Sequence, residues 1–493
     1  MDHRHGFLYG LDEKLEHSKK KPAFLHPSNR WTNVLTVIEN NKAQHQAWGP
    51  WTLGSVRKIK ILSFLFGLTV TVLIMASYIM TKDQKGLFLT PSPYHLTVES
   101  HPAQLSLNLS FTADYTVVRE VVRSIVAKVD FSHRRVPDLE QVRGKEPNIF
   151  SAIPRKFLPH LKNPCWYEEF FGNVTADPYG KNLYALYSKR FQAIYDHLRR
   201  AFPAHLHQHA GRQYRLRCLP FFYIIGQPKC GTTDLYDRLR LHPEVHFTTM
   251  KEPHWWTRKR FGIIRLSNGF HNPYPLNDYL DLFDQAANQI QDHLTSNSSK
   301  SHKKVDIIIG EASASTMWDN NAWVYFYDNG TEVEPPFLVQ DFIHAVQPDA
   351  RFIVMLRDPV ERLYSDYLYF GMANKSVEDF HERVRLQVGL YVIYLLDWLS
   401  VFSREQILIL RLEDHAANRK ITMRRVFEFL QLGPLTLQKE ADITKSPASN
   451  TRRPANRSLG PMLPITKEIL QSFYEPFNQR LAQVLRDPAF LWT

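Results

Sequence analysis

A glycine-containing loop between an apolar run and a helical pattern constrains the fold of this chain more than any other feature. The β-branched, apolar run Phe221–Ile225 precedes the loop, Gly226–Thr233, and residues 232–241 follow with a helical pattern. A strand, a glycine loop and a helix in this order hold a phosphate, because glycines let backbone N–H groups approach the anion and the helix N-terminus adds positive charge. The alternative is a glycine turn that binds nothing.

The loop differs from the one that nucleotide triphosphatases use. Gly226 and Gly231 have G-x-x-x-x-G spacing, but the lysine lies inside the loop at Lys229, and Thr232 and Thr233 directly follow the second glycine. An ATP- or GTP-binding loop would have G-K-[ST] at that point. The sequence therefore favours a phosphate site and disfavours a kinase of the P-loop class.

A second motif begins where another predicted strand, 351–356, ends. It reads Arg357-Asp358-Pro359, with Ser365 further along the predicted helix. Asp358 can cap this helix and Pro359 suits its first turn, so Arg357 leaves the sheet at the same edge as the phosphate loop. A guanidinium fixed there suits a second phosphate, to which Ser365 could add a hydroxyl. The alternative is a capped surface helix with a structural arginine.

A third motif carries groups suited to acid–base chemistry. Residues 251–256 read KEPHWW, in which Glu252 and His254 are both candidate bases. Burial against the two tryptophans would raise the pKa of Glu252. The alternatives are a surface carboxylate, a packed histidine and tryptophans of the core. The basic run Arg258–Arg260 follows and could face a sulfated sugar.

These motifs resemble those of the Golgi carbohydrate sulfotransferases. K-x-G-T-T resembles their 5′-phosphosulfate loop, and R-D-P-x-x-R-x-x-S-D-Y resembles their 3′-phosphate motif. The resemblance covers most of residues 150–493. It implies a P-loop-NTPase-like α/β sulfotransferase fold, with 3′-phosphoadenosine 5′-phosphosulfate (PAPS) as the sulfate donor and no metal requirement. It also implies transfer of sulfate to C-6 of N-acetylgalactosamine (GalNAc) 4-sulfate in chondroitin or dermatan sulfate.

The same resemblance implies roles for individual residues. The expected PAPS ligands are Lys229, Cys230, Gly231, Thr232 and Thr233 for the 5′-phosphosulfate, and Arg357 and Ser365 for the 3′-phosphate. Lys229 also stabilises the leaving phosphate. Glu252 corresponds to a glutamate that heparan sulfate sulfotransferases place before an aromatic pair, so it is the expected base, with His254 as its rival. Arg452 and Arg453 resemble part of a basic loop that closes over PAPS; a solvated basic loop is the alternative.

Two departures from the family bear on activity. Related heparan sulfate enzymes carry a lysine after a glutamate where this chain has Glu311 and Ala312. Only 22 positions separate Tyr367 from Gly389, where the family has a longer stretch that helps to form the acceptor cleft. The alternative function is therefore a membrane-tethered glycan- or nucleotide-binding protein with little turnover.

One uncharged, mostly apolar run predicts a membrane anchor. Residues 61–80 number 20, and at ~1.5 Å rise per residue they span ~30 Å, one hydrocarbon core. Six N-glycosylation sequons all follow this run, at Asn108, Asn173, Asn297, Asn329, Asn374 and Asn456. The layout predicts a type II Golgi membrane protein with a cytosolic tail (1–60), a signal-anchor helix (61–80), a lumenal stem (81–150) and a lumenal catalytic domain (151–493).

Net charge bears on the kind of partner that this chain binds, and cysteine content bears on metal sites and disulfides. The net charge of +12 fits an anionic partner, and the resemblance favours a sulfated glycosaminoglycan over nucleic acid. The oligomeric state stays open, with a homodimer as one alternative. Three scattered cysteines give no zinc spacing. A disulfide between Cys165 and Cys218 is possible in an oxidising lumen, which would leave Cys230 as a small residue of the loop.

Apolar runs alternate with helical patterns through the catalytic domain. The predicted strands are 221–225, 305–309, 351–356 and 406–412; the predicted helices are 232–241, 359–370, 390–402 and 423–430. Near-continuous Ile, Val and Leu strands separated by helices predict a parallel sheet covered on both faces. The nucleotide site is then expected at the carboxyl ends of the strands.

Overall fold

The computed structural model describes a large part of the chain. The described residues are 119–120, 123–124, 126–127, 131, 134–186, 189–263, 271–296, 306–327, 335–370, 386–451 and 460–492. The expected membrane helix at 61–80, most of the stem, and Arg452 and Arg453 lie outside them. Within these ranges, none of the helices combines the length and the apolar character that a bilayer crossing requires.

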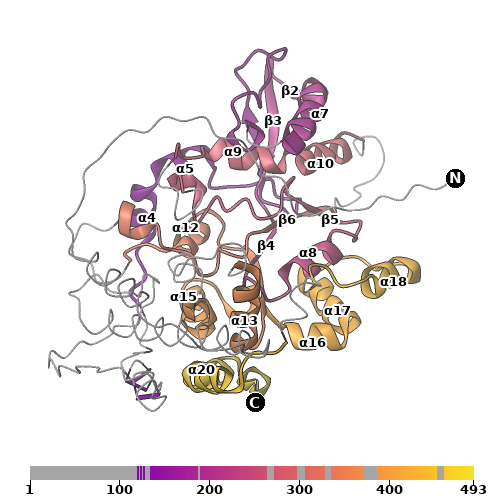
Figure 1. Cartoon of the computed structure of the whole chain (residues 1–493). Coiled ribbons are helices and arrows are strands. Elements are labelled where there is room, and N and C mark those ends of the chain that lie inside the picture. Colours follow the sequence, from indigo (N-terminus) through magenta and orange to yellow (C-terminus); the bar gives the residue numbers. More distant parts are fainter. Residues whose placement is uncertain are drawn as a thin grey trace, which may run out of the picture. The chain divides into compact units, whose positions relative to one another are not determined.

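A five-stranded sheet forms the centre of the fold (Figure 1). Its strand order is β5 (Val245–Phe247), β6 (Ile308–Ala312), β4 (Phe222–Gly226), β7 (Arg351–Leu356) and β8 (Ile407–Arg411). Every neighbouring pair is parallel, which confirms the predicted α/β fold with a parallel sheet. Because parallel strands all end at one edge, the loops after β5, β6, β4 and β7 gather there.

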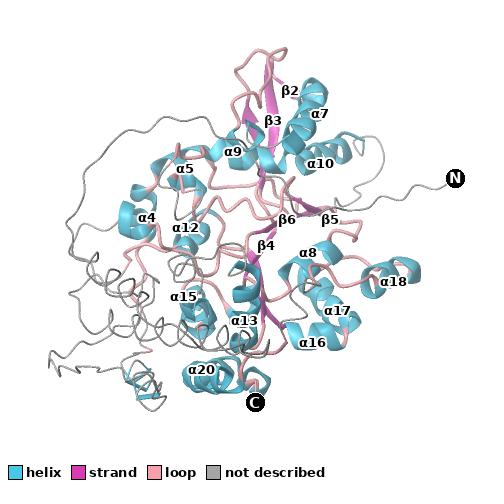
Figure 2. Ribbon diagram, viewed as in Figure 1, coloured by secondary structure: helices cyan, strands magenta, loops and turns pink. Residues whose placement is uncertain are grey.

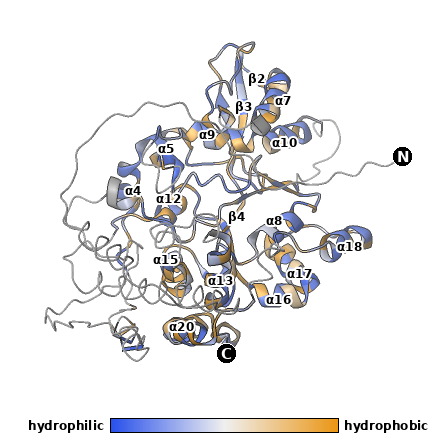
Figure 3. Cartoon of the chain, viewed as in Figure 1, coloured by the Kyte–Doolittle hydropathy of each residue, from blue (hydrophilic) through white to orange (hydrophobic). Residues whose placement is uncertain are grey.

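Helices separate and follow these strands along the chain (Figure 2). Helices between strands include α8 (Thr232–Leu239), α12 (Val339–Val346), α13 (Pro359–Phe370) and α15 (Tyr391–Leu399). Those that follow the last strand, β8, are α16 (Leu412–Ala417), α17 (Arg419–Leu430), α18 (Leu437–Lys445) and α20 (Pro464–Leu485). Helices α17 and α20 carry both hydrophilic and hydrophobic residues, as expected of helices that bury one side only (Figure 3).

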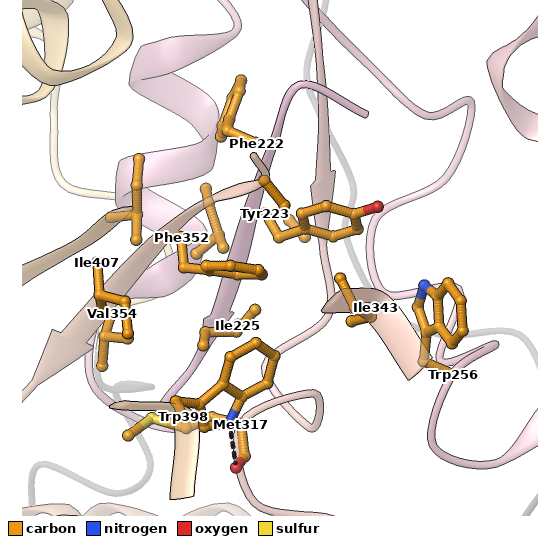
Figure 4. Packing of buried hydrophobic residues seen from close by; sticks show 14 of the residues in the cluster. Phe222, Tyr223, Ile225, Trp256, Met317, Ile343, Phe352, Val354, Trp398 and Ile407 are labelled. Atoms are coloured by element: carbon orange, nitrogen blue, oxygen red, sulfur yellow. Dashed lines mark hydrogen bonds between the residues drawn. The ribbon is translucent and has the colours of Figure 1, made fainter. Parts of the chain in front are cut away.

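The main core lies between the sheet and these helices (Figure 4). Phe222 of β4, Phe352 of β7 and Trp398 of α15 are fully buried. The indole Nε1 of Trp398 donates to the backbone carbonyl of Met317 over 3.1 Å, so its polar atom is satisfied inside the core. This packing fixes the strands whose ends carry the candidate site.

A second, antiparallel sheet has the order β1 (Cys165–Glu169), β3 (Arg212–Cys218), β2 (His207–His209). Cys165 and Cys218 are partners in the strand register and form a disulfide, as the sequence allowed. Helix α10 (Asp284–Ser296) packs against β3. Arg217 of β3 is completely buried there, and its Nη1 contacts Asp281 and Asp284 at 2.7 and 2.9 Å.

The folded core includes residues that precede the expected domain start near Ser151. Helices α4 (Leu139–Lys145) and α5 (Pro147–Ala152) contribute Val142 and Ile149 to the main core. Ser151 itself lies inside α5. The sequence missed this because these short helices carry only one buried apolar residue each.

Strand boundaries differ from prediction chiefly at β6. The predicted strand covers 305–309, whereas β6 begins at Ile308 and continues through Gly310 to Ala312. The apolar pattern ends at Gly310, but the strand continues because Gly310 to Ala312 pair with β4. Glycine stands at 310 because a side chain there would collide with the rings of Phe222 and Phe247. Strand β5 was not predicted, since three residues carry too little pattern.

Candidate active site

The phosphate loop connects β4 to α8, as predicted. Gly231 is the N-cap of α8, with φ of 88°. A Cβ at this position would come within 2.6 Å of Leu412, so the backbone conformation and the space both require glycine. The amide of Gln227 donates to the carbonyl of Met355 over 2.8 Å, which ties the loop to β7. The first N–H groups of α8 therefore point into a fixed loop and lack intrahelical partners.

Lys229 and Cys230 differ in exposure. The ammonium of Lys229 lies 3.7 Å from the ring centroid of Tyr369 in α13, and the side chain is partly exposed. Cys230 is buried, and burial raises the pKa of its thiol to about 12. A neutral thiol is unsuited to redox chemistry, so Cys230 is a small residue of the loop. Its backbone amide donates to the carbonyl of Gln227 over 3.2 Å, so its predicted role toward a phosphate stays a prediction.

The arginine motif lies on the neighbouring strand. Arg357 directly follows β7, and its Nη2 is 3.4 Å from Oε2 of Glu361. Asp358 accepts a 2.9 Å hydrogen bond from the amide of Val360, as expected of a capping residue. Ser365 is half-buried in α13. The roles of Arg357 and Ser365 toward a 3′-phosphate stay predictions.

Tyr391 joins the two phosphate motifs. Its buried hydroxyl donates to the carbonyl of Arg357 over 2.9 Å and lies 3.7 Å from the Sγ of Cys230. The sequence offers no signal for this role, because Tyr391 lies in an apolar helix, where a tyrosine is expected to be an ordinary core residue.

Glu252 and His254 lie side by side after β5. Nε2 of His254 is 3.4 Å from Oε2 of Glu252, and Lys251 forms an ion pair with Oε1 of the same carboxylate. Glu252 and His254 have φ of 61° and 53°. A left-handed backbone is costly for such residues and concentrates at functional sites. Lys229 shares this property with φ of 65°, so all three predicted catalytic residues have it.

Hydrogen bonds indicate which histidine tautomer is present. Nδ1 of His254 lies 2.7 Å from Oγ of Ser315, and Oγ1 of Thr257 lies 2.9 Å from the same oxygen. An ionised carboxylate only accepts, so Nε2 of His254 donates to Glu252 and Nδ1 accepts from Ser315. His254 therefore orients Glu252 and has no vacant lone pair for a substrate proton.

The pKa of Glu252 is lowered, so the expected upward shift is wrong. Burial acts to raise it, but the hydrogen bond from His254 and the charge of Lys251 outweigh this effect. Burial lowers the pKa of His254. Trp255 and Trp256 are 3% and 2% exposed and belong to the main core. Glu252 is therefore ionised and His254 neutral at neutral pH.

Glu311 is a further carboxyl group at this edge of the sheet. It is 1% exposed in β6, and burial, with a contribution from the charge of Glu252, raises its pKa to about 7. Oγ of Ser313 donates to Glu311 over 2.6 Å and accepts from the amide of His254 over 3.0 Å. Two serines of this segment, Ser313 and Ser315, therefore hold His254.

The predicted site residues therefore follow the order of the strands along one edge. Glu252 and His254 come after β5, Glu311 ends β6, the phosphate loop follows β4 and Arg357 follows β7. This places acid–base groups at one end and the two anion motifs beside each other. A separate cavity of ≈ 520 Å³ is lined by residues of α4, α5 and α12 and contains none of the predicted site residues.

Comparisons with known proteins agree with the sequence motifs. A family model described as "Sulfotransferase family" matches residues 220–435. Human (Homo sapiens) carbohydrate sulfotransferase 15 is 54% identical over 509 residues, covering 93% of this chain and 90% of the relative. Mouse (Mus musculus) heparan sulfate glucosamine 3-O-sulfotransferase 3A1 is 25% identical, covering 54% of this chain and 63% of that protein.

Solved structures also match. A sulfotransferase from Alicyclobacillus acidocaldarius has 22% sequence identity and a TM-score of 0.34, covering 55% of this chain and 98% of that one.

Proposed function

The chain belongs to the sulfotransferase family, and we propose that it transfers sulfate from PAPS to the C-6 hydroxyl of GalNAc 4-sulfate in chondroitin or dermatan sulfate. The observation that carries this proposal is the similarity to carbohydrate sulfotransferase 15 over 93% of the chain, together with two anion motifs on adjacent strands. We further propose the Golgi membrane as its location, with the catalytic domain in the lumen.

The residues present fit the charges of PAPS. The N-terminus of α8 and Lys229 offer backbone N–H groups and an ammonium to the 5′-phosphosulfate. Arg357 offers a partly exposed guanidinium to the 3′-phosphate from the adjacent strand. Gly231 supplies the left-handed backbone conformation from which α8 begins, so the N-terminus of this helix directly follows the loop. Metal ions are not needed to neutralise these phosphates in this scheme.

Transfer then needs one proton to move. The acceptor O6 attacks sulfur, the S–O bond to the 5′-phosphate breaks, and the O6 proton passes to the ionised carboxylate of Glu252. His254 orients that carboxylate through its Nε2. Lys229 stabilises the charge that develops on the leaving phosphate. The lowered pKa of Glu252 keeps it ready to accept, although it makes the carboxylate a weaker base.

Transfer of radiolabelled sulfate from PAPS to chondroitin 4-sulfate tests the proposal. The expected product contains GalNAc sulfated at both C-4 and C-6 after enzymatic depolymerisation. Binding of 3′-phosphoadenosine 5′-phosphate (PAP) and chondroitin 4-sulfate without any transfer would favour the alternative, a tethered binding protein. That alternative is motivated by the short stretch between Tyr367 and Gly389.

A further inference from the structure

Lys259 lies one turn beyond the Glu252–His254 pair. Its backbone amide donates to the carbonyl of His254 over 3.0 Å. Its ammonium lies 4.9 Å from the ring centroid of Tyr184 and 4.6 Å from that of Tyr274. The hydroxyl of Tyr184 donates to the carbonyl of Pro253 over 3.1 Å, so one ring contacts both Lys259 and the segment that carries the predicted base.

The three consecutive basic residues at this turn differ in their partners. Nε of Arg258 is 2.5 Å from Asp319, and Nη1 of Arg260 is 3.1 Å from Glu146. Within the ranges that the structure describes, Lys259 has no carboxylate within 4.0 Å. Its side chain is partly exposed. Lys259 is thus the cation of this run whose charge is available to a ligand.

Partial burial of this ammonium is unfavourable in the absence of an anion. Burial lowers the pKa of Lys259, because two aromatic rings replace water around the charge. Cation–π contacts offset part of this cost. An anionic ligand on the exposed side would stabilise the charged form.

We propose that Lys259 binds the 4-sulfate of the acceptor GalNAc and so selects 4-sulfated chains. The inference rests on the proposed function. In a sugar of galacto configuration, the axial O4 lies on the same side of the ring as C-6. A sulfate on O4 is therefore next to the hydroxyl that loses its proton to Glu252. Lys259 follows one turn after His254, the neighbour of Glu252, so its ammonium is available to that sulfate.

Calorimetry with two defined hexasaccharides, 4-sulfated and unsulfated chondroitin, tests this on the full chain with PAP bound. Lys259→Ala should lower the affinity for the 4-sulfated hexasaccharide about ten- to a hundredfold, which is the range for losing a hydrogen bond to a charged group. The affinities for the unsulfated hexasaccharide and for PAP should stay unchanged. Lys259→Arg should retain much of the affinity. Lys145→Ala is the matched control, because this exposed lysine also lies over a tyrosine, 5.3 Å from the centroid of Tyr327; it should change nothing.

The outcomes separate the inference from the function on which it rests. If wild type binds no PAP, the sulfotransferase function itself fails. If wild type binds PAP but Lys259→Ala binds the 4-sulfated hexasaccharide as well as wild type, or weakens both saccharides equally, the assignment of Lys259 is overturned. Thermal unfolding of each variant identifies a general folding defect, and Lys259→Gln then repeats the comparison with the stem of the side chain kept.

Discussion

The hydroxyl of Tyr391 donates a 2.9 Å hydrogen bond to the backbone carbonyl of Arg357. The same hydroxyl lies 3.7 Å from the Sγ of Cys230 in the phosphate loop. One buried side chain from α15 therefore contacts both motifs that we expect to hold the two ends of PAP, and it adds to the pairing of β4 with β7 that fixes their spacing. A rigid spacing between two phosphate sites favours a ligand with two phosphates over one with a single phosphate.

Replacing Arg357 should distinguish these two classes of ligand. Arg357→Ala should lower the affinity for PAP by roughly ten- to a hundredfold, since a charge-assisted hydrogen bond contributes about 1.5–3 kcal/mol. It should leave 5′-AMP, which has no 3′-phosphate, nearly unchanged. Calorimetry with both nucleotides measures the difference. Equal losses for the two would refute the assignment of Arg357 to the 3′-phosphate.

Arg424→Ala serves as the control for charge alone. Arg424 is an exposed arginine of α17, so its removal lowers the net charge by the same amount. Neither nucleotide should lose affinity. Tyr391→Phe should weaken PAP by several-fold only, because one neutral hydrogen bond of about 0.5–1.5 kcal/mol is lost while Arg357 keeps its charge.

The parallel sheet was predictable because its strands are buried on both faces and read as apolar runs. The antiparallel sheet was not, since three of the seven residues of β3 are arginines and its sequence resembles a solvent-exposed segment. Arg217 is nevertheless completely buried, which is possible only because Asp281 and Asp284, distant in sequence, neutralise it. The pattern of one strand contains no information about such partners.

The candidate site shows the same limit. The position of Lys229 after a strand was predictable because an apolar run precedes its loop, whereas Glu252 was selected by its resemblance to a family motif, since strand β5 was not predicted. The direction in which the pKa of Glu252 shifts was not predictable, because it depends on the rotamer of His254 and on which side the tryptophans face. Both tryptophans turn into the core. Ser315, which sets the tautomer of His254, lies on a different strand end and carries no motif of its own.

Glycosylation tests the topology. Asn173 is exposed, and its side chain accepts hydrogen bonds from the amide and hydroxyl of Thr175, the third residue of its sequon. We expect a glycan there if the catalytic domain is lumenal. Glycosidase treatment of the protein expressed in cells should lower its apparent mass, and Asn173→Gln should remove one glycan. A C-terminus accessible to protease in sealed microsomes would contradict the lumenal placement.

Glu311 should make stability depend on pH. Burial raises its pKa from 4.5 to about 7, so the folded state binds its proton more tightly than the unfolded state. The stability that the folded state gains from keeping Glu311 protonated is fully present below about pH 4.5 and is lost as the pH rises through 7. The shift corresponds to about 3 kcal/mol. Glu311→Gln should therefore raise the melting temperature near pH 8 relative to wild type and change it little near pH 5. Equal destabilisation at both pH values would show that the carboxyl is not the titrating group.

Glu252 should be the base, and Lys251 should lower the pKa of its carboxylate. Glu252→Gln should lower turnover by about 10²–10⁴-fold and leave PAP binding nearly unchanged, whereas His254→Ala should have a smaller effect. Lys251 lowers the pKa of Glu252, so Lys251→Ala should raise it. Glu252 then becomes protonated at a higher pH, and the acid limb of the kcat/KM profile should move to higher pH.

The pH–rate profile separates this assignment from its rival. If His254 were the base, Glu252→Gln would keep near-normal turnover and His254→Ala would abolish it. Lys251→Ala would then leave the acid limb in place, because Lys251 pairs with Glu252 rather than with His254. If the wild-type chain shows no turnover, the segment after Tyr367 is first restored from a longer relative such as the human protein, and the same variants are compared in that background.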